Sequence, residues 1–108
     1  MKDTYSENGV LANKVSLDEG INLAITYDGL LFISGADTVY AHFGYGTKWT
    51  NLNTLKMMRT GSGFRANIPI TRTGTVHVAF KDSASNWDNN SGSNYSFDVR
   101  TKKTTAKD

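Results

Sequence analysis

The chain has 108 residues, of which 38% are hydrophobic, 20% charged and 11% aromatic. This length limits it to one small domain with a single core and argues against a large enclosed catalytic pocket. Without cysteine it has no disulfide, thiolate nucleophile or cysteine-bound zinc. It contains no apolar run of about 18 residues and no signal-peptide pattern, so we expect no membrane span and no membrane partner.

The formal net charge of +2 comes from 12 basic and 10 acidic residues. Four basic residues lie in the last nine positions, at Arg100, Lys102, Lys103 and Lys107. Residues 1–99 carry 8 basic and 9 acidic residues, a net charge of −1. Proteins that bind nucleic acid usually have a basic stripe with interleaved aromatics. The basic residues here are scattered along the sequence, so we expect no nucleic-acid partner.

Both ends of the chain lack a hydrophobic pattern. Residues 1–14 are polar and without period, and residues 101–108 are rich in Thr and Lys. Such composition is typical of linkers. We therefore predict a flexible N-terminal linker over 1–14, a folded module over 15–100 and a C-terminal linker over 101–108. On this view the chain is one piece of a larger protein.

Between these ends the hydrophobic residues recur with a period of two, which is the pattern of half-buried strands. We predict strands at 21–27, 30–33, 38–43, 56–60, 64–70, 76–80 and 95–99, and no helix. Gly-containing turns separate them, and Pro69 places its strand at an edge or ends it there. Short strands at such spacing predict an all-β, immunoglobulin-like antiparallel β-sandwich.

The motifs of common enzyme classes are missing from the sequence. It has no G-x-S-x-G nucleophile elbow, no phosphate-binding Gly-Lys-Ser/Thr loop and no third glycine to complete a dinucleotide fingerprint. Glycoside cleavage usually requires two opposed carboxyl groups, whereas Glu7 and Glu19 lie in or near the unpatterned N-terminus. We therefore expect no catalysis and no cofactor.

The run from Asp88 to Gly92 invites comparison with a calcium-binding loop. An EF-hand would require a ligand two residues after Asn90 and a Glu at the twelfth position, where Gly92 and Val99 stand. The match fails, and no metal ligand is predicted there. A looser calcium site built from Asp82, Asp88 and nearby carbonyls stays open.

Two long polar segments, 42–51 and 81–96, interrupt the strand pattern, and each contains one Trp. A Trp side chain in an exposed loop leaves a large apolar ring in water unless the ring contacts a ligand or a partner. Sugars present apolar C–H faces edged by hydroxyls, so a protein that binds them combines flat rings with amide and acid groups. The two Trp-containing segments offer both, at Trp49, Trp87, Asp88, Asn89 and Asn90.

His42 joins this set by strand parity. If Val39, Ala41 and Phe43 face the core, His42 faces outward just before the segment that carries Trp49. The opposite parity remains open, because Tyr40 is also suited to a core.

The other aromatic and histidine positions have their own interpretations. For Trp49, a core and a ligand-binding interpretation both remain open. We interpret His77 as a solvated residue on the outer face of its strand, and four aromatics as core residues: Phe64, Phe80, Tyr95 and Phe97.

At these residues the chain resembles the starch-binding carbohydrate-binding modules of family 25, which are appended to secreted bacterial amylases. The resemblance runs from about residue 15 to residue 99. It rests on YDGLLFISGADTVYAHFGYGTKW (27–49), on Met58-Arg59-Thr60 followed by Gly63-Phe64, and on FKDSASNWDNN (80–90) followed by GSNYSF (92–97). Phe64 and Tyr95 depart from the family pattern, in which Trp is common.

The resemblance implies an immunoglobulin-like sandwich that binds α-1,4-linked glucose chains and performs no catalysis. Its binding residues map onto His42, Trp49 and Trp87, followed by Asp88, Asn89 and Asn90. It implies starch, amylose, glycogen and maltooligosaccharides as ligands, with the catalytic domain and tandem modules of a secreted, extracellular amylase as partners. We expect a monomer that targets this amylase to raw starch. The alternative is an immunoglobulin- or fibronectin-like protein-interaction domain whose Trp loops contact a partner protein.

Overall fold

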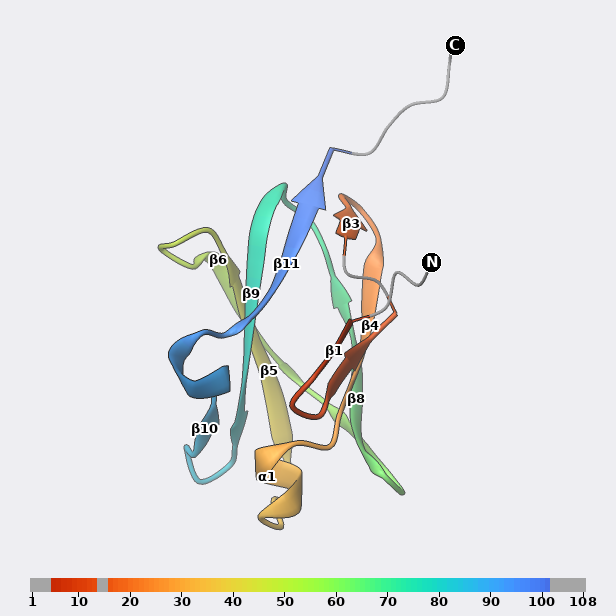
Figure 1. Ribbon diagram of the computed structural model, residues 1–108, viewed down its shortest axis with the longest axis vertical. Helices are drawn as coiled ribbons and strands as arrows, with labels where there is room; N and C mark the ends of the chain where they lie inside the picture. The colour runs from red at the N-terminus through yellow and green to blue at the C-terminus, as the bar shows by residue number, and fades with distance from the viewer. Residues whose placement is uncertain (1–4, 14–15, 102–108) are drawn as a thin grey trace.

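The computed structural model describes residues 5–13 and 16–101, which form two β-sheets that pack face to face (Figure 1). The first sheet contains five strands in the order β1-β2-β4-β8-β7. Their bounds are Tyr5–Glu7 for β1, Val10–Ala12 for β2, Asn22–Tyr27 for β4, Gly63–Pro69 for β8 and Met58–Thr60 for β7. All four pairings in this sheet are antiparallel.

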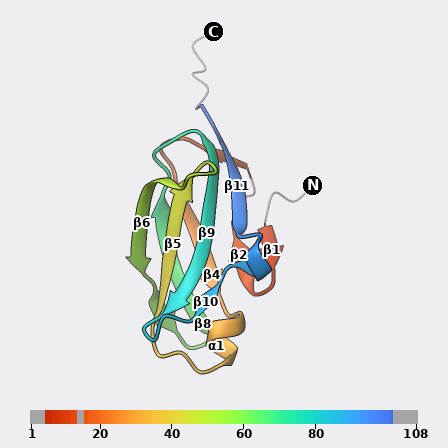
Figure 2. The same cartoon turned by 90° about the vertical axis from the view of Figure 1, so that its left-hand side faces the viewer.

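The second sheet has the order β3-β11-β9-β5-β6, with β10 also paired to β9 (Figure 2). Its strands are β3 (Ser16–Asp18), β11 (Tyr95–Arg100), β9 (Gly74–Asp82), β5 (Val39–Tyr45), β6 (Thr50–Lys56) and β10 (Trp87–Asp88). The prediction of an all-β sandwich is confirmed. One pairing departs from the expected antiparallel arrangement, because β3 runs parallel to β11.

The core is built by the inward-facing residues of both sheets. Strand β4 has the alternating burial expected of a half-buried strand, with Leu23, Ile25 and Tyr27 buried. The four aromatics predicted as core residues are each at most 1% exposed: Phe64, Phe80, Tyr95 and Phe97. Each of these four rings packs on another aromatic ring. Phe80 is stacked on Tyr27 with ring centroids 4.4 Å apart and lies 5.6 Å from the ring of Tyr95.

The prediction of a linker over residues 1–14 is wrong for residues 5–13. Strands β1 and β2 form a hairpin, and β2 extends the first sheet by pairing with β4. Val10 and Ala12 are buried in the core, but three-residue strands are too short to show a period in the sequence. Residues 1–4, 14 and 15 lie outside the described residues. Residues 102–108 of the predicted C-terminal linker also lie outside them. Thr101, the first residue of that linker, is described and is exposed.

The strand predicted at 30–33 is an α-helix, α1 (Leu30–Ile33), so the prediction of no helix is also wrong. A short apolar run cannot be assigned to strand or helix from its pattern alone. Only Leu31 of the four residues is buried, while Leu30 is 57% and Ile33 is 78% exposed. The N–H of Leu31 donates to the Tyr27 hydroxyl at 3.0 Å, which fastens the helix to the end of β4.

Much of the two predicted loops is ordered as strand. The turn between β5 and β6 spans residues 46–49, and β10 and the 3₁₀ helix η1 (Asn90–Gly92) occupy the second segment. The strand predicted at 56–60 is divided at the buried Met57, with β6 in one sheet and β7 in the other. Pro69 is the last residue of β8, as its missing N–H predicts.

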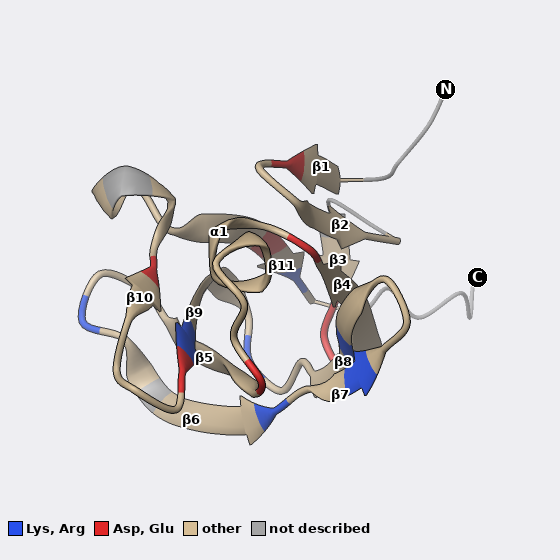
Figure 3. Ribbon diagram, turned by 90° about the horizontal axis from the view of Figure 1, so that it is seen from below, with Lys and Arg blue, Asp and Glu red and all other residues tan. Residues whose placement is uncertain are grey.

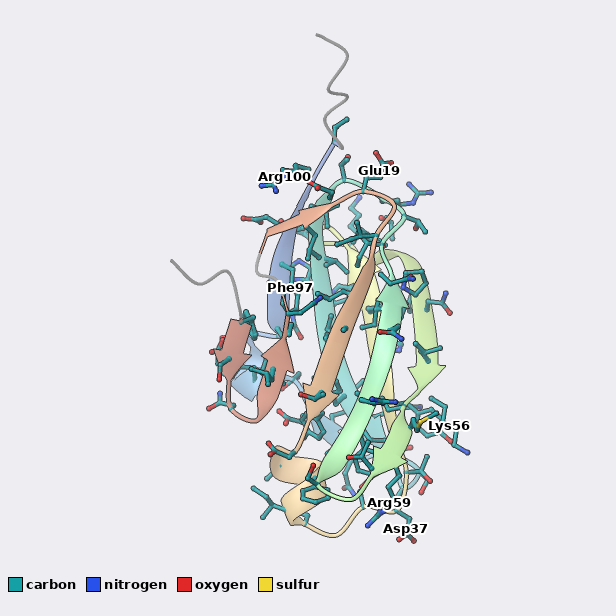
Figure 4. The ribbon with its side chains drawn as sticks, turned by 90° about the vertical axis from the view of Figure 1, so that its right-hand side faces the viewer. Glu19, Asp37, Lys56, Arg59, Phe97 and Arg100 are labelled. Carbon is teal, nitrogen blue, oxygen red and sulfur yellow. The ribbon has the colours of Figure 1, made fainter. Side chains whose placement is uncertain are left out.

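Basic and acidic residues are distributed over many elements of the ribbon and do not gather on one of them (Figure 3). Arg100 pairs with Asp18 at 2.7 Å, and Arg59 donates to the carbonyl oxygens of Ala36 and Asp37 at 3.1 and 3.4 Å. These two arginines lie at opposite ends of the sandwich (Figure 4). No helix in the described part of the chain is long and apolar enough to span a membrane.

Candidate functional site

Four rings gather on the outer face of the second sheet, on or beside the strands that Figure 2 shows in front. Trp49 lies 5.8 Å from His42 and 5.7 Å from His77, with ring planes inclined by 31° in both pairs. The ring centroids of Trp87 and His42 are 5.2 Å apart, and their planes are inclined by 77°. We call the shallow depression here, of about 240 Å³, the aromatic groove; its lining residues are His42, Trp49, Leu52, Ala79, Trp87, Asn89 and Asn94.

The register between β5 and β9 brings the two histidines together. His42 stands opposite Ala79, and Gly44 stands opposite His77. Because side chains alternate across a sheet, both imidazoles project from the outer face, as the parity of β5 predicts. Ala79, also on this face, is only 3% exposed although it lies outside the core cluster. Its small side chain leaves room for the rings above it.

Trp49 has an unusual backbone conformation. Its φ is +52°, in the left-handed region that bulky residues rarely occupy and that costs about 1–3 kcal/mol. The register of β5 and β6 shifts between Phe43 and Tyr45. At Gly44, within this shift, a Cβ atom would lie 2.9 Å from the Trp49 carbonyl oxygen. The ring is half-buried on the outer face, so the core interpretation of Trp49 is wrong.

Neighbouring positions in β10 send Trp87 and Asp88 to opposite sides of the sheet. Trp87 pairs with Lys81, whose side chain is on the outer face, while Asp88 pairs with the buried Phe80. Trp87 is consequently 45% exposed, with the Lys81 Nζ 5.6 Å from its ring centroid. Asp88 is 7% exposed and is the only buried polar or charged residue of the described chain.

Both carboxylate oxygens of Asp88 are used inside the protein. The hydroxyl of Tyr27 donates to Oδ2 at 2.6 Å, and the hydroxyl of Tyr95 donates to Oδ1 at 3.0 Å. The N–H of Asn90 also donates to Oδ1, at 3.2 Å. Burial, and then the hydrogen bond to Asp88, raise the pKa values of both tyrosines, so their hydroxyls stay protonated and donate. Asp88, predicted to contact sugar, therefore turns inward.

The two predicted asparagines differ in their surroundings. Asn90 has a fully engaged amide that receives a hydrogen bond from Asn8 at 2.6 Å and donates to Glu7 and to the Asn94 carbonyl. Asn89 lines the aromatic groove, and its Oδ1 accepts the Gly92 N–H at 3.0 Å. The side-chain nitrogen of Asn89 is therefore the donor in this run that is best placed for a ligand.

The His42 imidazole is neutral at neutral pH. Its partial burial, and to a lesser degree the positive charge of Lys81, lower the pKa of His42 below its ordinary value of about 6.5. Its Nδ1 shares a hydrogen bond of 2.7 Å with the Thr54 hydroxyl on β6. The ring thus contacts both tryptophans while one of its nitrogens is held by the neighbouring strand.

Sequence reasoning missed two residues in or beside the groove. His77, interpreted as merely solvated, packs against Trp49, and its Nδ1 shares a 2.7 Å hydrogen bond with the Ser96 hydroxyl. Leu52, 53% exposed, lies on β6 and lines the groove. The sequence does not show that β6 lies beside β5, so this position could not be foreseen. A second depression of about 720 Å³ lies on the other side of Trp87, against α1 and the β1–β2 turn.

The carboxylates named for a looser calcium site are occupied by protein donors. Asp82 accepts the backbone N–H groups of Ala84 and Asn86 at 2.9 and 2.8 Å and the Asn86 side-chain amide at 3.0 Å. These bonds, led by the Asn86 side chain, lower the pKa of Asp82. Within residues 5–13 and 16–101, no group of three or more His, Asp or Glu gathers where it could hold a metal ion.

The groove therefore offers inclined apolar rings, exposed aliphatic surface and an amide. Such a surface can stack on the C–H face of a sugar and hydrogen-bond to its hydroxyl edge. Comparisons with family models, with curated proteins and with solved structures gave no match for this chain.

Proposed function

We propose that this domain binds α-1,4-linked glucose chains of starch or glycogen through the aromatic groove, without catalysis, and holds an attached extracellular amylase on its substrate. The observation that carries the proposal is the gathering of two tryptophans and two histidines outside the core, on one face of a sheet. Covering large rings with a ligand removes apolar surface from water, which contributes about 25 cal/mol per Å².

The inclination of the rings favours a curved polysaccharide. Because His42 is inclined by 31° to Trp49 but by 77° to Trp87, the two indole planes are not parallel. Successive sugars of a curling α-1,4-linked chain present their faces at an angle and can meet both rings. A flat β-1,4-linked chain is better matched by coplanar rings.

The shallow groove predicts weak binding by one domain. Few contacts must offset the lost freedom of both partners, so we expect a Kd of roughly millimolar to micromolar. An attached catalytic domain or a tandem module would raise the effective affinity by tethering. Weak single-site affinity is thus compatible with firm attachment to insoluble starch.

An NMR titration tests the proposal directly. Maltose-series oligosaccharides should shift the indole N–H resonances of Trp49 and Trp87 and the amide of Asn89, with saturation at millimolar concentrations or below. A cellooligosaccharide of equal length serves as the control and should cause much smaller shifts. If the maltose series leaves these resonances unmoved, starch binding is contradicted and the protein-interaction alternative gains support.

Acid should weaken binding through His42. A bound sugar would cover the imidazole further and disfavour its charged form, lowering the pKa of His42 beyond the depression already present. By linkage, affinity should be constant near neutral pH and fall as pH drops through the His42 pKa. The ring protons of His42, followed by NMR from about pH 7.5 to about pH 4.5, should give a lower pKa with maltooligosaccharide than without.

His77 packs against Trp49 and Lys81 lies near the Trp87 ring, so the ring signals of His42 must be assigned separately from those of His77. An unchanged or raised His42 pKa in the complex would contradict coverage of this ring by the ligand.

A further inference from the structure

We propose that Asp88 is a positioning residue, whose buried carboxylate holds Trp87 in the orientation that binds the polysaccharide. This inference rests on the proposed function for its effect on affinity, but its structural part does not. It replaces the sequence-based expectation that Asp88 itself contacts sugar. The geometry assigns the carboxylate to the interior, one residue away from the exposed ring.

Trp87 is a half-exposed ring on a very short strand. Strand β10 has only two residues, and the Trp87 side chain is 45% exposed. Its aromatic and cation–π contacts within the described residues are those with His42 and Lys81. A half-exposed ring on so short a strand would lose much conformational freedom on binding a ligand. Any fixed attachment next to it therefore lowers the entropic cost of binding.

Asp88, next to Trp87 in β10, is anchored by hydrogen bonds from both sheets. Tyr27 belongs to β4 of the first sheet and Tyr95 to β11 of the second, so the two hydroxyls hold the carboxylate from separate layers. The Tyr27 hydroxyl also accepts the Leu31 N–H at 3.0 Å, which joins α1 to the same network.

The two tyrosine donors are themselves packed in the core. The rings of Tyr27 and Tyr95 are 1% and 0% exposed and both contact Phe80, at 4.4 and 5.6 Å. A carboxylate accepts only, and here it meets two hydroxyls and one N–H that donate. Loss of one partner in such a buried network leaves the others poorly satisfied.

Tyr95→Phe is the decisive variant, because this residue is 0% exposed and does not line the aromatic groove. It removes one hydrogen bond to Asp88 and should weaken binding of a maltooligosaccharide by about three- to tenfold. Asp88→Asn should weaken binding at least as much, because its amide brings a donor against the tyrosine donors. Ile68→Val, at a 0% exposed position of β8, lowers stability without touching the network and should change affinity less than about twofold.

A second measurement works on the free protein. The Trp87 indole N–H should be rigid on the nanosecond scale in the wild type and in Ile68→Val, and more mobile in Tyr95→Phe, as read by its heteronuclear NOE. An unchanged indole together with unchanged affinity in Tyr95→Phe overturns the proposal. So does weakening by Asp88→Asn alone, which means direct contact, or equal weakening by Ile68→Val, which means a general effect of stability. If the wild type binds no glucan, the proposed function fails, and the indole mobility still decides the positioning role.

Discussion

Trp87→Ala is expected to abolish retardation of the protein in a native gel that contains soluble starch. The ring is 45% exposed and outside the core cluster, so its loss removes stacking surface and leaves the packing of the sandwich unchanged. We expect affinity to fall by about tenfold or more, as for a central aromatic contact, while the free energy of unfolding changes by about 1 kcal/mol or less. The gel and a thermal unfolding curve measure the two effects.

Met58→Ala is the matched control for this variant. Met58 is 62% exposed, but it lies on β7 in the first sheet, away from the groove. Its truncation should leave migration in starch unchanged. If Trp87→Ala migrates like the wild type, the assignment of the groove is contradicted, whatever the domain binds elsewhere.

Gly44→Ala is expected to lower both stability and sugar affinity. The new Cβ would lie 2.9 Å from the carbonyl oxygen and 3.0 Å from the Cα of Trp49. These are backbone atoms, so the turn that carries the indole must move. Overpacking of this kind costs about 1–3 kcal/mol of unfolding free energy. Because Trp49 is held against His42 and His77, its displacement should also separate the rings that form the groove.

Gly61→Ala provides the comparison, since no heavy atom lies within 4 Å of the Cβ position there and the glycine has no positive φ. This variant should differ from the wild type by about 1 kcal/mol or less in stability and should keep its affinity. Wild-type binding by Gly44→Ala would mean that the close approach of Gly44 to Trp49 has no part in forming the site.

Several structural features converge on Trp49. Its left-handed backbone, the register shift beside Gly44 and the two imidazoles beside its ring all act on one side chain. A conformation that costs free energy persists only where the surroundings determine it. Under the proposed function, this conformation presents the indole to the ligand before binding.

Several features followed from the sequence alone. Alternating hydrophobicity predicted the sandwich, its aromatic core and the outward direction of His42, because a period of two reports directly which face of a strand is buried. The concentration of Trp, Asn and Asp in two segments also predicted which segments carry the two tryptophans that line the candidate groove.

Only the tertiary structure decided which of these residues share a surface. The register of β9 with β5 and β10 brought His77 to Trp49 and sent Asp88 inward while Trp87 faced outward. It also showed that residues 5–12 form a hairpin of the first sheet and that 30–33 form a helix. Local pattern records burial at each position, but it does not record which strand lies opposite, and a shift of one residue in pairing would reverse the direction of every side chain.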